Sequence, residues 1–188
     1  NAILVLTRKI ERRQVIQMNN PTIVPFGAWE SPITAEAIVS DSVRLGQIAV
    51  DGRDVYWSEL RPSEEGRSTI VKRDEAGFIE VLPAAFNART RAHEYGGGAF
   101  CVSDGDIFFC NDADQRIYRV RIGDTPVPLT PEGAYRYADL VVDREHDRLI
   151  CVREDHTADG EPENTLVAVR FDGSVEVLAE GRDFYAAP

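Results

Sequence analysis

Polar side chains that could bind a ligand or take part in a reaction gather in one short stretch, Arg89 to Gly98. The stretch carries two arginines, a histidine, a glutamate and a tyrosine, and it ends in three consecutive glycines. A glycine run is unfavourable inside a strand or helix, because glycine loses more conformational entropy on folding than any other residue. Such runs are found where the backbone turns sharply or where another group approaches it closely. The stretch is therefore a candidate active or binding site, and its simplest alternative is a glycine-rich loop that joins two sheets.

The sequence patterns of common catalytic and metal sites are missing. The chain has no G-x-S-x-G nucleophile elbow, no P-loop and no G-x-G-x-x-G after a strand. His93-Glu94 is followed by Tyr95-Gly96-Gly97, which leaves out the second histidine of the H-E-x-x-H zinc motif. We therefore expect no bound metal ion and no cofactor.

Two other histidines and two pairs of carboxylates fall in predicted loops. His146 lies in a tight turn, where we expect it to be exposed to solvent. His156 lies in an acidic loop whose carboxylates do not have the spacing of a calcium-binding loop. Glu64-Glu65 and Glu161/Glu163 occupy polar loops at matching places of the sequence, so we expect their side chains to be solvated.

The composition excludes several classes of partner. The 188 residues carry a net charge of −11, with a pI of about 4.7, whereas binding to nucleic acid needs a basic face. The same charge disfavours an anionic membrane surface, and no apolar run reaches the roughly 18 residues of a membrane-spanning helix. Cys101, Cys110 and Cys151 lie in apolar runs without C-x-x-C spacing. They are expected to be reduced, buried thiols of a cytoplasmic protein.

The first 44 residues differ from the rest of the chain. We expect residues 1–20 to be an N-terminal extension, in which Asn1-Ala2 is the remnant of a cleaved tag and Met18 is the natural start. An ordinary N-terminal strand or short helix is the alternative. Residues 21–44 are expected to form an extended segment and a short helix, which begins at the N-cap Ser31 with Pro32 in its first position and ends near Val39.

From residue 45 to residue 188 the sequence repeats a pattern of four strands. Each unit has four segments rich in Val, Ile, Phe and Tyr, which are separated by Asp-Gly turns and polar loops. The segments are 47–50, 55–57, 69–73 and 79–82; then 99–102, 107–110, 116–121 and 126–129; and finally 139–142, 148–152, 166–171 and 175–178. Four strands in roughly 45–50 residues are typical of a propeller blade. The sequence therefore predicts an all-β fold, a partial β-propeller of about three four-stranded antiparallel blades, with the start of a fourth blade at residues 183–188.

The apolar pattern of the strands agrees with stacked blades. Phe108-Phe109 and Leu149–Val152 are nearly continuous apolar runs, which a sheet packed on both faces requires. Arg116, Arg119 and Arg121 alternate with apolar residues, so we expect them on a solvated outer strand. Three blades leave apolar faces open, and we expect the chain alone to associate with itself through them.

The polar stretch from Arg89 to Gly98 lies between the last strand of the first unit and the first strand of the second. In a propeller, all such connections emerge on one face, near the central channel, where propellers bind ligands. The side chains that we expect to project there, as candidate substrate-binding residues, are Arg89, Arg91, His93, Glu94 and Tyr95.

Several motifs together resemble the amino-terminal part of the prolyl oligopeptidase family of serine peptidases. They are Trp29 with Ser31-Pro32-Ile33-Thr34, Asp54-Val55-Tyr56-Trp57, Arg61-Pro62-Ser63-Glu64-Glu65-Gly66-Arg67, Asn87 to Gly98, Tyr137-Ala138-Asp139 and Arg153-Glu154-Asp155-His156. The most similar branch is that of the bacterial dipeptidyl aminopeptidase/acylaminoacyl-peptidase-like proteins. The resemblance covers about residues 21–188, and the His-Glu-Tyr-Gly-Gly-Gly block is its most specific part.

The resemblance implies that the complete protein has two domains with different roles. In this family a β-propeller covers a carboxy-terminal α/β-hydrolase domain, which carries the Ser-Asp-His triad and hydrolyses short peptides. The resemblance therefore assigns no catalytic residue to this chain, which we expect to be inactive alone. Its expected contributions are gating of an oligopeptide substrate and docking to the hydrolase domain.

The candidate residues fit such a role chemically. Glu94 can pair with a peptide ammonium group, and Arg89 or Arg91 can hold a peptide carbonyl or carboxylate. Two alternatives stay open: these three side chains pair with one another and lock the connection, or they contact the hydrolase domain. The alternative function is a non-enzymatic β-propeller that binds proteins. A metal-dependent sugar or lactone enzyme would need several acidic or histidine residues converging on the channel, and no such set is evident.

Overall fold

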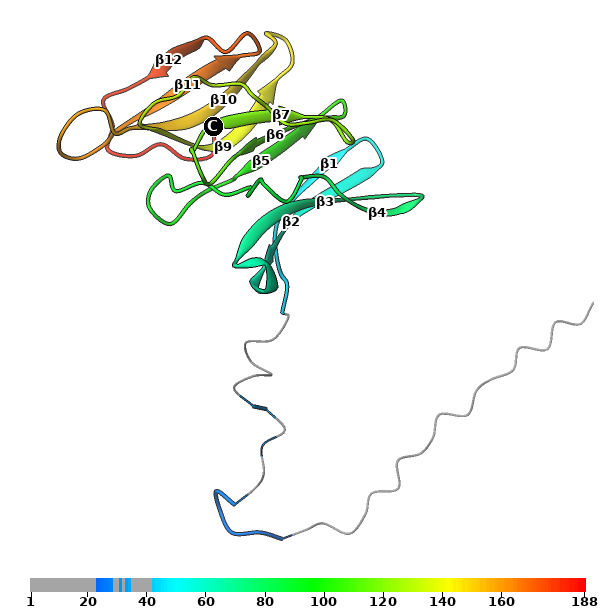
Figure 1. Ribbon diagram of the computed structural model, residues 1–188. Coiled ribbons are helices and arrows are strands. Elements are labelled where there is room, and N and C mark those ends of the chain that lie inside the picture. Colours follow the sequence, from blue (N-terminus) through cyan, green and yellow to red (C-terminus); the bar gives the residue numbers. More distant parts are fainter. Residues whose placement is uncertain (1–22, 29–30, 32, 35–41) are drawn as a thin grey trace, which may run out of the picture.

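The chain folds into three successive antiparallel sheets, as a computed structural model that describes residues 23–28, 31, 33–34 and 42–188 shows (Figure 1). Sheet 1 consists of β1 (Arg44–Asp51), β2 (Asp54–Arg61), β3 (Arg67–Asp74) and β4 (Gly77–Glu80). Sheet 2 consists of β5 (Phe100–Ser103), β6 (Asp106–Cys110), β7 (Ile117–Val120) and β8 (Val127–Pro128). Sheet 3 consists of β9 (Tyr135–Asp143), β10 (Arg148–Asp155), β11 (Glu163–Arg170) and β12 (Val175–Ala179). The one helix in the described part of the chain is a single 3-10 turn, η1 (Pro62–Glu64).

Every strand pairs with the strand that follows it in the same sheet, so each sheet is an up-and-down meander. In sheet 1, Tyr56 of β2 lies opposite Ala49 of β1 and Lys72 of β3. The β1–β2 turn contains Gly52 at φ 60°, a left-handed conformation that glycine adopts without steric cost. The predicted all-β architecture, with four antiparallel strands in each of three units, is confirmed.

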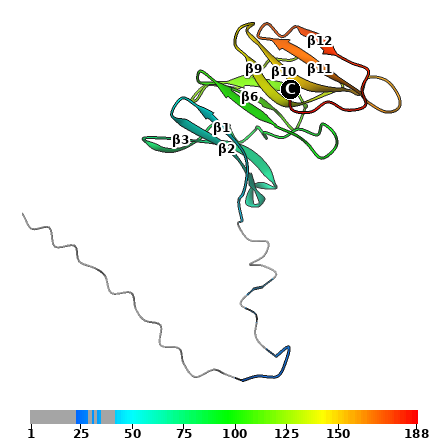
Figure 2. The ribbon, with the colours of Figure 1, turned by 180° about the vertical axis from the view of Figure 1, so that it is seen from behind.

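Two apolar clusters hold the three sheets together. The first lies between sheets 1 and 2 and includes Tyr56, Ile70 and Phe109. The second lies between sheets 2 and 3 and includes Phe108, Leu149 and further buried residues of β10 and β11. Sheet 2 lies between sheets 1 and 3 (Figures 1 and 2). Side chains alternate across a strand, so Phe109 packs toward sheet 1 while Phe108 packs toward sheet 3. The continuous apolar run of β6 therefore reflects burial on both faces, as predicted, and each ring contributes about 1.5–3 kcal/mol by its removal from water.

The turns β1–β2, β5–β6 and β9–β10 contact one another at one end of the sheets. The Asp51 carboxylate accepts a hydrogen bond from the Gly105 N–H at 2.7 Å, which links sheets 1 and 2. Arg144 of sheet 3 pairs with Asp104 of sheet 2 at 3.1 Å and lies 3.9 Å from Asp51. Polar turns thus add links between the sheets beyond the apolar clusters.

Arg119 of β7 and Arg121 just after it are 39% and 57% exposed, in line with the prediction of a solvated face, but they are also paired. Arg119 and Arg121 both form two-pronged hydrogen bonds to Asp106, with donor–acceptor distances of 2.7–3.0 Å. The guanidinium groups of Arg121 and Arg119 hold the pKa of the Asp106 carboxyl far below its usual value. Arg119 also lies over the rings of Phe108 and Phe171. The sequence could not show this, since Asp106 comes from the neighbouring strand.

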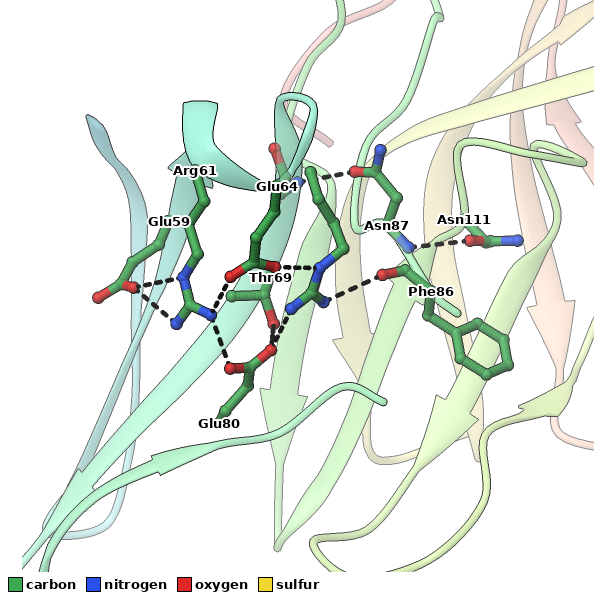
Figure 3. A network of polar contacts seen from close by, with 10 residues as sticks. Glu59, Arg61, Glu64, Thr69, Glu80, Phe86, Asn87 and Asn111 are labelled. Carbon is green, nitrogen blue, oxygen red and sulfur yellow. Dashed lines mark hydrogen bonds and ion pairs between the residues drawn. The ribbon is translucent and has the colours of Figure 1, made fainter. Parts of the chain in front are cut away.

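Glu64 departs from the prediction of a solvated loop. It accepts hydrogen bonds from Arg61 and Arg67, which also reach Glu80 (Figure 3). Burial opposes the ionisation of Glu80, but the hydrogen bonds from Arg67 and Arg61 outweigh it and hold the pKa of this carboxyl below its usual value. Pairing with both arginines likewise lowers the pKa of Glu64. The network joins the β2–β3 loop to β4.

The remaining structural predictions have mixed outcomes. The three cysteines are free thiols, and burial raises the pKa of each. His146 is exposed, as predicted, and contacts Asp143 at 2.9 Å. The predicted extension at 1–20 and most of the helix predicted from Ser31 lie outside the described residues. No helix among the residues described has the length and apolar character needed to cross a membrane.

Candidate functional site

The stretch singled out by the sequence lies in the long connection between β4 and β5, residues 81–99, called connection 81–99 below. Because the strands alternate in direction, this connection, the β6–β7 loop and the β10–β11 loop all lie at the end of the sheets opposite the contacting turns (Figure 1). The connection contacts sheet 1, crosses to sheets 2 and 3, and then enters β5. It therefore brings its own side chains next to loops that are distant in the sequence.

The first part of the connection is anchored to sheets 1 and 2. The side-chain oxygen of Asn87 accepts the Ser68 N–H at 2.9 Å, and the Asn87 N–H donates to the Asn111 side chain at 3.2 Å (Figure 3). Arg67, a member of the charged network, donates to the Phe86 carbonyl at 3.2 Å. These bonds fix the path of the backbone as it leaves sheet 1.

Among the described residues, neither candidate arginine has an ion pair with Glu94. The Arg91 side chain donates to the Asp112 carbonyl at 2.9 Å, and its backbone N–H donates to Gln115 at 2.7 Å. Arg89 is exposed, and its side chain has no ion-pair partner in the described part of the chain. The alternative in which Arg89, Arg91 and Glu94 pair with one another is therefore wrong, because Arg91 binds the β6–β7 loop instead.

His93 and Glu94 stand at the turn of the connection in an unusual backbone conformation. Their φ angles are 54° and 62°, in the left-handed region that residues with a Cβ atom rarely adopt. Such strain persists where the surrounding structure enforces it, and it is often found at functional sites. The Glu94 side chain is exposed, and Tyr95 stacks on His93 with ring centroids 5.9 Å apart.

A buried carboxylate from sheet 3 holds this turn. Glu154, at the end of β10, is 3% exposed and accepts the His93 N–H at 2.5 Å. His93 Nδ1 lies 3.3 Å from the same oxygen, Oε1. The other oxygen, Oε2, is 3.0 Å from His156 Nε2 and 3.8 Å from Arg136 Nη1. The carboxylate therefore joins the connection to sheet 3 over a sequence separation of 61 residues.

The three glycines permit a close approach to β9. Gly96 has a φ of 89°, and a Cβ atom there would lie 3.0 Å from the Thr90 carbonyl oxygen. A Cβ at Gly97 would lie 3.0 Å from the Cβ of Ala138, and one at Gly98 would lie 3.1 Å from the Asp139 carboxylate. The Gly98 N–H donates to that carboxylate at 2.7 Å. Both uses of a glycine run, a sharp turn and a close approach, occur here.

The turn of the connection and the β10–β11 loop border an open depression of about 800 Å³, called the acidic depression below. It is lined by His93, Glu94, Tyr95, Arg136, Glu154, His156, Gly160, Glu161, Pro162, Asn164, Asp183 and Phe184. Four of these residues carry carboxylates, against one arginine and two histidines. The lining also includes the exposed aromatic rings of Tyr95 and Phe184. An acidic surface with aromatic rings is suited to a ligand that carries an ammonium group, which both carboxylates and ring faces attract.

The structure thus divides the five candidate residues. His93, Glu94 and Tyr95 line the acidic depression, whereas Arg89 and Arg91 do not. Sequence reasoning did not select Glu154, His156 or Arg136 as candidates. The Arg153-Glu154-Asp155-His156 motif of the family resemblance was a signal for the first two, and Arg136 had none. Among the described residues, no three His, Cys, Asp or Glu side chains are grouped so as to hold a metal ion.

Known structures supply the context for this geometry. The chain is similar to a puromycin-hydrolysing peptidase of Mycobacterium tuberculosis, with 36% sequence identity and a TM-score of 0.80 over 89% of this chain. It is also similar to a puromycin hydrolase, with 34% identity and a TM-score of 0.75 over 85% of this chain. A mutant of puromycin hydrolase complexed with PGG gives 34% identity and a TM-score of 0.75 over 84% of this chain. No protein-family model and no curated protein matches the chain.

These similarities confirm the resemblance to the prolyl oligopeptidase family of peptidases. The identity is high enough to indicate common ancestry over the described sheets and their connections. The match covers 29%, 28% and 27% of the three solved chains, so this chain spans less than a third of the length of these relatives.

Proposed function

We propose that this chain forms part of the β-propeller of a serine peptidase and that it shapes the path by which small peptide-like substrates reach a catalytic domain. The observation that carries the proposal is the similarity to two puromycin-hydrolysing enzymes across 85% or more of the chain. The relatives are more than three times as long as the matched region, which leaves room for a hydrolase domain in the complete protein.

The acidic depression supports a role in substrate binding. Puromycin is an aminoacyl compound with a free ammonium group next to the amide bond that a peptidase would cleave. Glu94 is exposed at the rim, and the left-handed backbone of residues 93 and 94 sets the direction of its side chain. A carboxylate placed there can pair with such an ammonium group, and the Tyr95 ring beside it offers a cation–π contact.

The outer face of sheet 1 supports a larger propeller. Leu45, Ile48 and Val50 of β1 and Phe78 of β4 are all more than 60% exposed. In the complete protein we expect another sheet of the same propeller to cover this face, which would bury the apolar area. The isolated chain is expected to associate with itself through it.

Replacement of Glu94 in the complete protein tests the proposed function. Glu94→Gln should raise KM for puromycin by about tenfold or more, since a charge-assisted hydrogen bond contributes about 1.5–3 kcal/mol and about 1.4 kcal/mol corresponds to a factor of ten. The variant should leave KM for an N-acetylated analogue unchanged, because that substrate carries no ammonium group. Steady-state kinetics with both substrates give the comparison.

The matched control is Glu65→Gln, the same chemical change at an exposed glutamate of the β2–β3 loop, which does not line the depression. It should not alter KM for either substrate. If Glu94→Gln changed both KM values equally and lowered the melting temperature, Glu94 would have a structural role and the substrate contact would be refuted.

A further inference from the structure

Glu154 is the most completely buried carboxylate among the residues that line the acidic depression, and solvent hardly reaches it. Its side chain is 4% exposed, whereas its neighbours His156 and Arg136 are each 27% exposed. A buried carboxylate is unfavourable unless it is paired and hydrogen-bonded. Here the groups around it are the His93 N–H, two imidazole rings and a guanidinium group. Its environment satisfies the carboxylate but leaves it little access to a ligand.

The bond to the His93 N–H is the contact that bears on the candidate site. It fixes the first of two consecutive residues in the left-handed region. The next bonds in the turn are local: the Glu94 N–H donates to the Arg91 carbonyl at 3.0 Å, and the Gly96 N–H donates to the Ala92 carbonyl at 2.9 Å. Arg136 of sheet 3 also donates to the Arg91 carbonyl at 2.9 Å, two residues earlier. Glu154 is therefore the hydrogen-bond partner that ties His93 itself to sheet 3, directly before the exposed Glu94 and Tyr95.

We propose that Glu154 is a positioning residue: it holds the His93–Tyr95 turn over sheet 3, and so places the Glu94 carboxylate and the Tyr95 ring at the rim of the acidic depression. The inference rests on the proposed function, in which Glu94 contacts the ammonium group of the substrate. In this view Glu154 sets the position of the turn, and Glu94 contacts the ligand. Arg136 and His156 hold the second oxygen of the carboxylate and so fix its orientation.

Two conservative variants of the complete protein distinguish the effect of the length of the Glu154 side chain from the effect of its charge. Glu154→Gln keeps the length of the side chain and an oxygen that can accept the His93 N–H, but it loses the charge. Glu154→Asp keeps the charge but is shorter by one C–C bond of about 1.5 Å, which takes its oxygens out of hydrogen-bonding range of that N–H. The control is Glu161→Gln, a charge change in the same depression at a side chain without a contact to connection 81–99.

Two measurements are made on each variant. The first is amide hydrogen exchange of residues 92–98, which reports on the turn and does not depend on activity. Glu154→Asp should speed this exchange about tenfold or more, while Glu154→Gln and Glu161→Gln should leave it within about twofold of the unmodified protein. The second is the kinetics with puromycin, in which Glu154→Asp should raise KM about five- to tenfold at unchanged kcat, and Glu154→Gln should largely retain the original KM.

The outcomes distinguish the inference from the function on which it rests. If Glu154→Gln raised KM as much as Glu154→Asp did, the charge would act on the substrate directly and the positioning role would be refuted. The same holds if Glu154→Asp left hydrogen exchange of the turn unchanged. If Glu154→Asp altered exchange as expected but neither this variant nor Glu94→Gln changed KM, the proposed substrate contact would fail while the anchoring of the turn would stand.

Discussion

The pairing of Asp106 with two arginines gives a prediction whose size follows from the structure. Asp106→Asn keeps the shape of the side chain and removes its charge. The Asp106 side chain is 12% exposed and receives two hydrogen bonds from each of Arg119 and Arg121. The Arg119 side chain is 39% exposed and that of Arg121 is 57% exposed, so solvent weakens the second pair more.

The expected loss is obtained from these two pairs. The half-buried, two-pronged pair with Arg119 contributes about 1.5–3 kcal/mol, and the pair with the exposed Arg121 adds little because solvent screens it. Asp106→Asn should therefore lower the free energy of unfolding by about 1.5–3 kcal/mol at pH 7. Asp104→Asn is the matched control, since Asp104 is 72% exposed and has one ion pair, with Arg144. It should cost less than about 0.5 kcal/mol.

The same pair predicts how this contribution depends on pH. The pKa of Asp106 is lowered in the folded chain, whereas an unfolded aspartate has a pKa of about 3.9. The stabilisation is therefore fully present above about pH 5 and is lost as the pH falls below the unfolded pKa toward the folded one. Between pH 5 and pH 3, the difference between the unmodified chain and Asp106→Asn should shrink by about 1 kcal/mol.

Urea unfolding at pH 7, 5 and 3, followed by tryptophan fluorescence, measures both effects. A difference of the same size at pH 3 and pH 7 would show that the charge of Asp106 is not the source of the stabilisation. If Asp106→Asn lowered the free energy of unfolding no more than Asp104→Asn does, the pairs of Asp106 with Arg119 and Arg121 would not be strongly stabilising.

Two further predictions concern the glycine run and the packing between sheets. Gly96→Ala should cost about 2–3 kcal/mol, because the left-handed conformation is unfavourable for alanine and the new Cβ meets the Thr90 carbonyl at 3.0 Å. Gly105→Ala has a similar φ but no atom within 4 Å of the Cβ, so urea unfolding should show a smaller loss, and equal losses would contradict the close approach. Phe108→Ala should cost about 3–5 kcal/mol, because this ring is 1% exposed between sheets 2 and 3. Phe78→Ala, at a ring that is 70% exposed, should cost less than about 0.5 kcal/mol in the same assay, and similar values for the two would contradict the packing described here.

Local sequence patterns were sufficient for most of the fold. The run Phe108-Phe109 indicated a strand buried on both faces, because neighbouring side chains on a strand point to opposite sides. Asp51-Gly52 marked the first hairpin turn, since glycine there adopts a left-handed conformation. Each of these patterns lies within the strand or turn that it predicts, so no knowledge of distant residues was needed.

The candidate site was only partly predictable, because its decisive contacts join residues that are far apart in the sequence. Glycines 96–98 marked the turn and the close approach correctly, but not which strand comes close. The pairing of Arg91 with the β6–β7 loop and of the His93 N–H with Glu154 depends on how sheets 2 and 3 are placed, which no local pattern contains. The pairing of Arg119 with Asp106 could not be predicted for the same reason, as Asp106 lies on the adjacent strand.

Connection 81–99 also bears on how the three sheets fold. In arrays where each repeat contacts only its neighbours, a terminal repeat can fray without disturbing distant ones. Here a segment between sheets 1 and 2 is bonded to sheet 3 at Tyr137, Asp139 and Glu154, across separations of 47, 41 and 61 residues. These contacts close large loops, so they form late in folding and raise the cooperativity of the array. Local unfolding of sheet 3 would release the turn that carries Glu94. The shape of the acidic depression therefore depends on the stability of sheet 3, which comes after this turn in the chain.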